Sequence, residues 1–142
     1  MAGKTYYQSD RVLNLFLGST VTGAAATYAN LFVTNPTGDG QDGTEWLAGR
    51  VRVQQGFHAT EPFWSSPQSE GNLRYVDNVR TVSWTMGAVG VYTANETVVG
   101  VGVWDASTGG NLLYWEAFDV SKTLSATEEI AFGTGALKVR ED

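Results

Sequence analysis

The stretch 98–118, VVGVGVWDASTGGNLLYWEAF, decides the fold of this chain. Val99, Val101 and Val103 recur at every second position, which is the side-chain period of one face of a β-strand. Residues 105–111, DASTGGN, are of types that bond their own backbone or accept a positive φ, and a second apolar run follows at once. The stretch therefore predicts a β-hairpin.

Glycines separate the valines of this strand, at Gly100 and Gly102. A phosphate-binding loop is excluded, because no GK[ST] motif and no helix follow the glycines. Glycine inside a strand instead lets another backbone or an aromatic ring approach closely. We expect the two glycines to serve packing in the sheet.

Strand signals continue on both sides of the hairpin, with turn residues between them. Further strands are predicted at 28–34, 46–55, 78–85, 87–92, 128–132 and 136–140. This spacing favours an all-β fold, an antiparallel β-sandwich or jelly-roll-like architecture with one short N-terminal helix. We expect one such domain over residues 1–142, with residues 1–10 as an extended arm and residues 57–72 as an ordered excursion packed on a surface.

The predicted helix, RVLNLFL, spans 11–17, after Ser9 or Asp10 as N-cap and before Gly18 as its end. A helix this short is not stable alone. Its apolar side must therefore pack on the sheet of its own chain or on the surface of a neighbour. That side consists of Val12, Leu13, Phe16 and Leu17.

Composition excludes several classes of function. The net charge of -6 opposes binding to nucleic acid. No window approaches the roughly 18 apolar residues of a membrane span. The chain has no cysteine, which rules out disulfides, thiolate metal sites and a thiol nucleophile. The sequence predicts a protein without a membrane or nucleic-acid partner.

Two polar features resemble metal or catalytic sites but lack the required pattern. His58, the single histidine, has no HExxH, GxSxG or comparable signature around it. Asp39, Asp42 and Glu45 lie in or beside a glycine-rich loop and carry the oxygen ligands of a calcium site, but their spacing fails the EF-hand pattern. We predict a structural or surface histidine, an ordinary loop, no metal and no cofactor.

Paired carboxylates raise the possibility of glycosidase chemistry. Glu128 and Glu129 are adjacent, so on a strand they point to opposite faces and do not form a catalytic pair. Glu116 and Asp119 form a looser pair, and an enzyme acting on glycans is the least favoured of the functions considered. No catalytic residue is predicted.

The chain is rich in aromatic residues, with five tryptophans and six tyrosines. In β-sandwiches most such side chains fill the core, whereas exposed ones stack on sugars or form protein interfaces. A carbohydrate-binding module that uses Trp64 or Trp115 is therefore the alternative function. Arg50, Arg52, Arg74 and Arg80 are the most clustered cations and can face either solvent or an acidic partner.

Four segments together resemble small bacteriophage virion proteins of the tail-fibre type. The most telling parts are Asn35-Pro36 leading into residues 43–45, and the hairpin from Trp104 to Leu112. These combinations of turn and strand residues specify a fold better than an activity. The segments are VLNLFLGST (12–20), ATYANLFVTNPTGDGQDGTEW (26–46), VGVWDASTGGNLLYWEAF (101–118) and KTLSATEEIAFGTGALKV (122–139).

The resemblance implies a non-enzymatic β module of the virion, made in the host cytoplasm. It would be an exterior capsid decoration or cement protein, or a tail-fibre-like accessory protein, that contacts the major capsid protein or tail components. A homo-oligomer, such as a trimer, is expected because assemblies close by symmetry. The residues predicted to make these contacts are Tyr6, Tyr7, Leu13, Phe16, Leu17, Arg50, Arg52, Phe63 and Trp64.

Overall fold

The hairpin predicted from the sequence is present and lies at the centre of the largest sheet. Strand β10 (Glu96–Trp104) pairs antiparallel with β11 (Leu112–Leu124), and Val103 lies opposite Tyr114. The loop between them turns at Gly109 and Gly110, with φ values of 59° and 69°. Left-handed backbone at two successive positions explains the glycine pair.

The computed structural model describes residues 2–22, 26–37, 42–46, 53–55, 57–58, 61–85, 96–125 and 128–141. Besides β10 and β11, these ranges contain β1 (Ala2–Lys4), α1 (Tyr6–Phe16), β2 (Thr27–Thr34), β3 (Thr44–Glu45), β4 (Val53–Gln55), β5 (Phe57–His58), β6 (Glu61–Pro62), β7 (Gln68–Glu70), β8 (Leu73–Asp77), β9 (Val82–Thr85), β12 (Glu129–Phe132) and β13 (Lys138–Glu141). The paired strands are antiparallel, so the predicted all-β class with one short helix is confirmed for the described chain.

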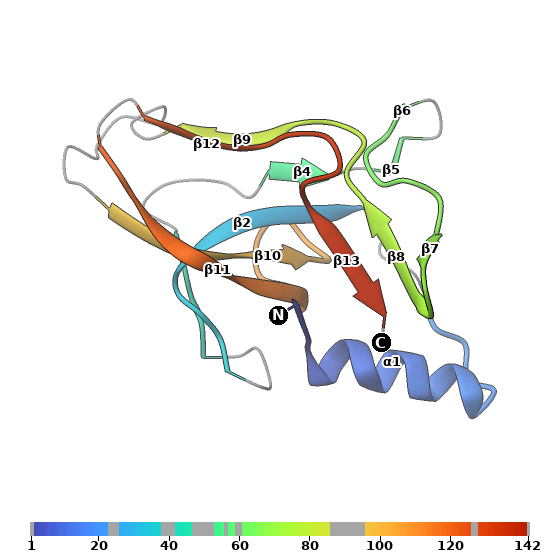
Figure 1. Cartoon of the computed structure of the whole chain (residues 1–142). Coiled ribbons are helices and arrows are strands. Elements are labelled where there is room, and N and C mark those ends of the chain that lie inside the picture. Colours follow the sequence, from blue (N-terminus) through green and yellow to red (C-terminus); the bar gives the residue numbers. More distant parts are fainter. Residues whose placement is uncertain are drawn as a thin grey trace.

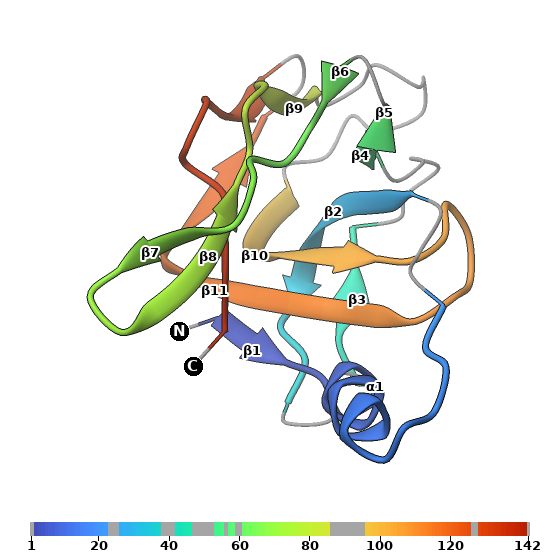
Figure 2. The same ribbon diagram turned by 90° about the vertical axis from the view of Figure 1, so that its right-hand side faces the viewer.

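The largest sheet has the strand order β1-β11-β10-β2-β3, with β4 also paired to β2 (Figures 1 and 2). Strand β2 ends as predicted, directly before Asn35 and Pro36. Of the strand predicted over 46–55, the structure describes β4 at its end, while β3 lies just before it. Residues 47–52 and the strand predicted at 87–92 lie outside the described residues.

Three smaller sheets complete the fold: β12-β9, β13-β8-β7 and β5-β6. The strand predicted over 78–85 is present only in its second half, as β9, whereas residues 78–81, beginning with Asn78, separate β9 from the preceding strand β8. Asn78 is fully buried, and its side chain donates to the carbonyl oxygens of Arg80 and Gly133 and accepts from the Leu137 amide. The break in the strand is therefore a hydrogen-bonded corner that joins β8 and β9 to the C-terminal strands.

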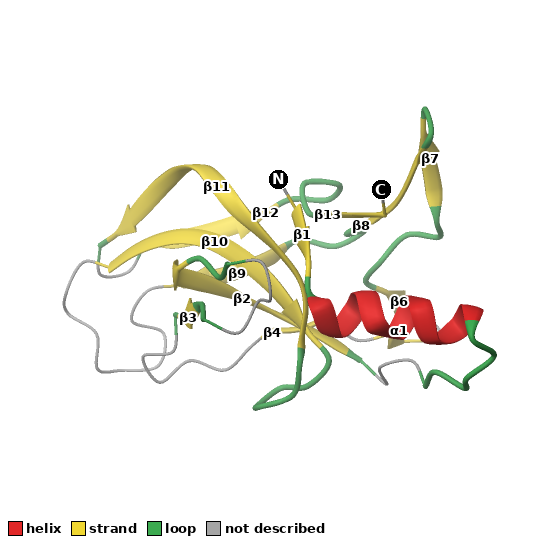
Figure 3. Ribbon diagram, turned by 90° about the horizontal axis from the view of Figure 1, so that it is seen from below, coloured by secondary structure: helices red, strands yellow, loops and turns green. Residues whose placement is uncertain are grey.

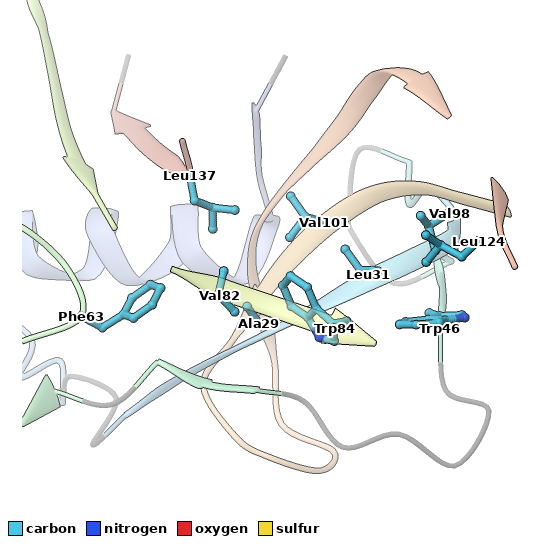
Figure 4. Close-up of a cluster of buried hydrophobic side chains, with 10 residues drawn as sticks. All are labelled: Ala29, Leu31, Trp46, Phe63, Val82, Trp84, Val98, Val101, Leu124 and Leu137. Atoms are coloured by element: carbon cyan, nitrogen blue, oxygen red, sulfur yellow. The ribbon is translucent and has the colours of Figure 1, made fainter. Parts of the chain in front are cut away.

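The main core lies between the large sheet and β9 (Figure 4). Ala29 and Leu31 from β2 pack with Val101 from β10, and they meet Val82 and Trp84 from β9. Full burial of a valine or leucine side chain contributes about 1.5–3 kcal/mol. This layer therefore provides the main apolar contribution to folding.

A second, smaller cluster contains Phe32, Trp104 and Leu112. The ring centroids of Phe32 and Trp104 are 5.2 Å apart. A Cβ atom at Gly102 would lie 2.7 Å from Phe32 Cε2 and 2.7 Å from Trp104 Cη2. The expectation that glycine here allows an aromatic ring to approach is therefore met.

The N-terminus differs from its prediction. Residues 2–4 form β1, which pairs with β11, and the helix begins at Tyr6, so the expected extended arm is instead part of the sheet and the helix. The N-cap is Thr5, rather than Ser9 or Asp10, and its hydroxyl accepts from the Gln8 amide at 3.3 Å. The predicted helix end is correct, since Gly18 follows with φ 75°.

The segment 57–72 also differs from its prediction as a surface excursion. It contributes β5, β6 and β7, and β7 forms a hairpin with β8 that turns at Gly71 with φ 61°. Phe63 is buried in the main core. Prolines 62 and 67 mask the strand periodicity here because each interrupts a short strand pattern.

Candidate functional site

Helix α1 exposes large apolar side chains on the surface of the described structure. It spans 11 residues, none of them buried, and among the described residues no helix is long and apolar enough to cross a membrane. The relative exposures are 66% for Tyr6, 59% for Leu13, 58% for Leu15, 85% for Phe16 and 79% for the C-cap Leu17. The apolar side of the helix therefore does not pack on the sheet of its own chain.

Four of these side chains share one side of the helix. At about 100° per residue, Tyr6, Leu13, Phe16 and Leu17 fall within one sector, and we call them the α1 stripe. Leu15 lies about 200° from Leu13 and so occupies the opposite side. The sequence predicted three members of the stripe correctly as one side of a helix; the exposure of Leu15 was not anticipated.

The polar side of α1 is the side attached to the rest of the chain. Gln8 Nε2 donates to Tyr114 Oη at 3.2 Å, and Arg11 Nη2 donates to the carbonyl oxygen of Thr22 at 2.6 Å. The Arg11 guanidinium also lies 5.7 Å from the centre of the Tyr7 ring. This attachment reverses the usual arrangement of an amphipathic helix, in which the apolar side faces the core.

Thr5 fixes the start of the helix. It is fully buried, its hydroxyl donates to the carbonyl oxygen of Leu112 at 2.7 Å, and its amide donates to that of Leu113 at 3.2 Å. From this point α1 continues from β1 and runs away from the large sheet (Figure 3). The α1 stripe is therefore exposed, on a helix whose start is fixed by the contacts of Thr5 with β11.

The remaining predicted contact residues are elsewhere. Tyr7 is half-buried beside Arg11 and does not belong to the stripe. Phe63 is only 7% exposed, and its ring meets that of Trp64 edge to face at 5.0 Å. Trp64 Nε1 donates to Thr27 Oγ1 at 3.0 Å. Arg50 and Arg52 lie outside the described residues.

A groove runs beside β11, against the segment that joins β12 to β13. Glu116 and Asp119, the loose carboxylate pair of the sequence, both line it. The other lining residues are Val101, Ala117, Phe118, Phe132, Ala136 and Leu137. The groove thus combines hydrogen-bond acceptors with aromatic and aliphatic surface.

The described carboxylates in and beside the glycine-rich loop accept hydrogen bonds from other residues of this chain. Asp42 accepts from the Thr37 hydroxyl and from the Thr37 amide, each at 2.6 Å, and these two bonds lower the pKa of Asp42. Glu45 accepts from Asn30 Nδ2 at 2.9 Å. Asp39 lies outside the described residues, within which no group of three or more histidines or acids could hold a metal ion.

The other candidates from the sequence are His58 and the pair Glu128 and Glu129, and each lies in or beside a short strand. His58 lies in β5, opposite Glu61 of β6. Glu128 accepts from the Ser125 amide at 2.5 Å, and bonds from Ser125 lower the pKa of its carboxyl. Glu129 begins β12 and lies opposite Thr85.

Aromatic rings on the sheets are mostly covered. Trp46, Trp84 and Trp104 are buried, and Trp64 and Trp115 are half-buried. Where exposure is described, the aromatic side chains in the exposed class are Tyr6 and Phe16, both in the α1 stripe. Flat stacking of a sugar on Trp64 or Trp115 therefore gains no support from their burial.

Comparison with known proteins identifies the family of this chain. A family model described as Podophage GP4 fiber I protein gp80 matches residues 3–140. The search of curated proteins finds no match. The resemblance to phage virion proteins of the tail-fibre type is confirmed, and the chain belongs to the podophage GP4 fibre I protein gp80 family.

Proposed function

We propose that this protein is a non-enzymatic structural component of a phage fibre that attaches to a neighbouring virion protein through the α1 stripe. The observation that carries the proposal is the exposure of Leu13, Phe16 and Leu17, at 59%, 85% and 79%. Family membership supports the fibre role. The partner would be a tail component, and a capsid decoration or cement position is the other placement on the particle.

The energetics favour a covered stripe. Complete burial of a leucine or phenylalanine side chain contributes about 1.5–3 kcal/mol, so partial burial of Leu13, Phe16 and Leu17 together with the Tyr6 ring supplies several kcal/mol. Clusters of exposed apolar side chains on soluble proteins usually mark interaction sites. The attachment of α1 through Thr5, Gln8 and Arg11 leaves the stripe ordered before a partner arrives, which lowers the entropic cost of binding.

The test is complementation of phage that lack the gene. Particles made with the wild-type protein should contain it, and a density map should place it on the tail. Particles made with Leu13→Ser plus Phe16→Ser should lack it, although the soluble variant accumulates in the host cytoplasm. Normal incorporation of this variant would contradict attachment through the stripe, and density confined to the capsid shell would contradict the fibre role.

Carbohydrate binding is a second candidate, favoured by the groove beside β11. Carboxylates such as Glu116 and Asp119 accept hydrogen bonds from sugar hydroxyls, and the rings of Phe118 and Phe132 offer apolar surface next to them. Glycan-array binding that is lost in Glu116→Gln plus Asp119→Asn, but kept in Glu128→Gln, would support it. Absence of binding by the wild-type protein would rule it out for the glycans on the array.

A further inference from the structure

We infer that the groove beside β11 binds an extended segment of a different protein, in which an apolar side chain lies next to a lysine or arginine. The groove shares no residue with the α1 stripe, so its role does not depend on attachment through the helix. The same groove carries the second candidate function, carbohydrate binding. Its strand edge, its apolar floor and its charge together favour a polypeptide over a sugar.

Strand β11 bulges out of the large sheet beside the groove. The register against β10 changes between two pairs, Val98 with Lys122 and Gly100 with Ala117. Four residues of β11, 118–121, therefore span the interval that β10 covers with one residue. Figure 3 shows β11 curving away from β10 between the paired ends. Bulges often lie beside functional sites, where they redirect side chains.

The other edge of β11 is also open along the bulge. The pairing of β1 with β11 runs from Lys4 opposite Tyr114 to Ala2 opposite Glu116 and does not extend to the bulge. Among the described residues, no strand pairs with 118–121 on either side. The amide and carbonyl groups of such an edge can bond an added strand, which is a common way of binding an extended peptide. This regular pattern of donors and acceptors matches a polypeptide backbone better than a sugar.

Beside this edge, the groove forms an apolar pocket. Its floor contains the buried Val101 and Leu137, and its wall contains the half-buried Phe118 and Phe132. The ring centroids of the two phenylalanines are 5.8 Å apart, and Phe132 also meets Trp84 of the main core edge to face at 6.1 Å. Because the core holds these rings, the pocket exists before a partner binds, which lowers the entropic cost of binding. An apolar side chain of the partner fits here.

The rim of the groove is acidic. Asp119 is exposed and forms no hydrogen bond or ion pair within the described part of the chain. Glu116 lines the same groove, and none of the described lining residues is basic. Val120, next to Asp119 in the bulge, is 81% exposed. A segment that combines apolar residues with lysine or arginine complements this surface, since opposite charges across an interface guide and orient binding.

Charge also argues against a second copy of this chain as the occupant. The chain carries a net charge of -6, so two copies repel each other, and an acidic groove is a poor site for an acidic protein. A basic segment of a different protein meets no such repulsion.

The experiment uses a fluorescently labelled, blocked peptide of alternating leucine and lysine, five residues long, and a control peptide with glutamate in place of lysine. Anisotropy titrations with the purified full chain should show saturable binding of the lysine peptide and none of the glutamate peptide. Asp119→Asn should weaken binding about two- to fivefold, the range of an exposed ion pair. Asp10→Asn removes a likewise exposed carboxylate from α1 and should leave binding unchanged.

Two alanines test whether the peptide lies in the groove. Ala136 lines the groove and Ala131 of β12 does not, although both are exposed. Ala136→Trp should fill the pocket and abolish binding, and Ala131→Trp should leave it intact. Circular dichroism confirms that each variant is folded.

Pairing with the strand edge has a signature of its own. Alternate amides of a strand point to the same edge, so N-methylation at the lysines in one peptide and at the leucines in another should weaken binding in only one of the two. Equal effects of the two methylations would exclude strand pairing.

Absence of binding by the lysine peptide, equal binding of the glutamate peptide, or binding that survives Ala136→Trp would overturn the inference. Glycan-array binding that Ala136→Trp abolishes, without peptide binding, would assign the groove to a sugar instead. Failure of the proposed function is a separate outcome, because Leu13→Ser plus Phe16→Ser changes α1 and should leave peptide binding unchanged.

Discussion

Thr5 and Leu112 are joined by a hydrogen bond of 2.7 Å from the threonine hydroxyl to the leucine carbonyl oxygen. The two residues are 107 positions apart, and they connect the N-cap of α1 with the first residue of β11. The hydroxyl oxygen of Thr5 also accepts from the Gln8 amide within the helix. One side chain thus caps the helix and sets its direction relative to the central hairpin.

Replacing Thr5 by valine keeps the branched shape and removes both bonds. We expect Thr5→Val to lower the free energy of unfolding by about 1–2 kcal/mol, the usual cost of losing a polar N-cap. Urea denaturation followed by circular dichroism measures this loss. The exposed Thr20→Val is the matched control, and a loss of equal size at both positions would contradict the role given to Thr5.

A side chain at Gly102 should disturb the second core cluster. Because a Cβ atom there would lie 2.7 Å from the rings of Phe32 and Trp104, we expect Gly102→Ala to cost about 1–3 kcal/mol. At Gly133 nothing lies within 4 Å of such an atom, and the φ angle there is ordinary, so Gly133→Ala should be close to neutral. Thermal unfolding of both variants decides the point.

Gly100 gives a related prediction for the sheet itself. Its Cβ position is occupied by the side-chain oxygen of Asn35 and approached to 2.6 Å by the carbonyl oxygen of Glu116. We expect Gly100→Val to impair folding and incorporation into particles more severely than Gly102→Ala, since backbone cannot move aside as a ring can. Unchanged stability together with normal incorporation would refute this.

Asn78 should be among the most sensitive positions of the chain. Its amide nitrogen donates to Arg80 and Gly133, and its side-chain oxygen accepts from Leu137 at 2.8 Å. Asn78→Ala leaves these buried groups without partners, and we expect a loss of about 2–4 kcal/mol. The exposed Asn72→Ala, in the turn between β7 and β8, should change the urea midpoint little.

Asp105 makes part of the stability dependent on pH. Burial would raise the pKa of its carboxyl, but the Asn111 side chain and backbone amide, at 2.9 Å and 2.7 Å, lower it below the ordinary 3.8, with help from the charge of Arg11. The stability that the charged form contributes is complete above 3.8 and is lost as pH falls through the lower folded pKa.

The corresponding experiment compares the wild type with Asp105→Asn. The variant should be less stable at about pH 6, and the difference should shrink at a pH well below 3.8, as the wild-type carboxyl takes up a proton. Urea midpoints at the two pH values measure it. A difference that is the same at both would show that the charge of Asp105 contributes nothing.

The sequence predicted best where the signal is local. The alternation of valines identifies β10, the glycine pair identifies the loop before β11, and Gly18 marks the end of α1. The N-terminal residues were mispredicted because β1 exists only through its pairing with β11, in which Gly3 lies opposite Trp115. A local sequence pattern contains no information about a strand partner as distant as β11.

For the candidate site, too, some features follow from the local sequence and others depend on tertiary contacts. Helical spacing alone places Leu13, Phe16 and Leu17 on one side, and composition alone excludes thiol chemistry. Whether that side would pack inward or outward was decided by the polar bonds of Gln8 and Arg11, which attach the opposite side. The burial of Phe63, which had been predicted at the surface, was likewise decided by packing.

The sequence by itself thus determined the central hairpin with its turn and the amphipathic pattern of the helix, because side-chain periodicity and backbone preference act between neighbours in the chain. Only the tertiary structure decided that the helix starts at Thr5 and that Asn78 forms a corner. It also decided that the apolar side of α1 remains exposed. These features depend on hydrogen bonds and contacts between residues far apart in sequence, such as Thr5 with Leu112, and exist only once the sheet has assembled.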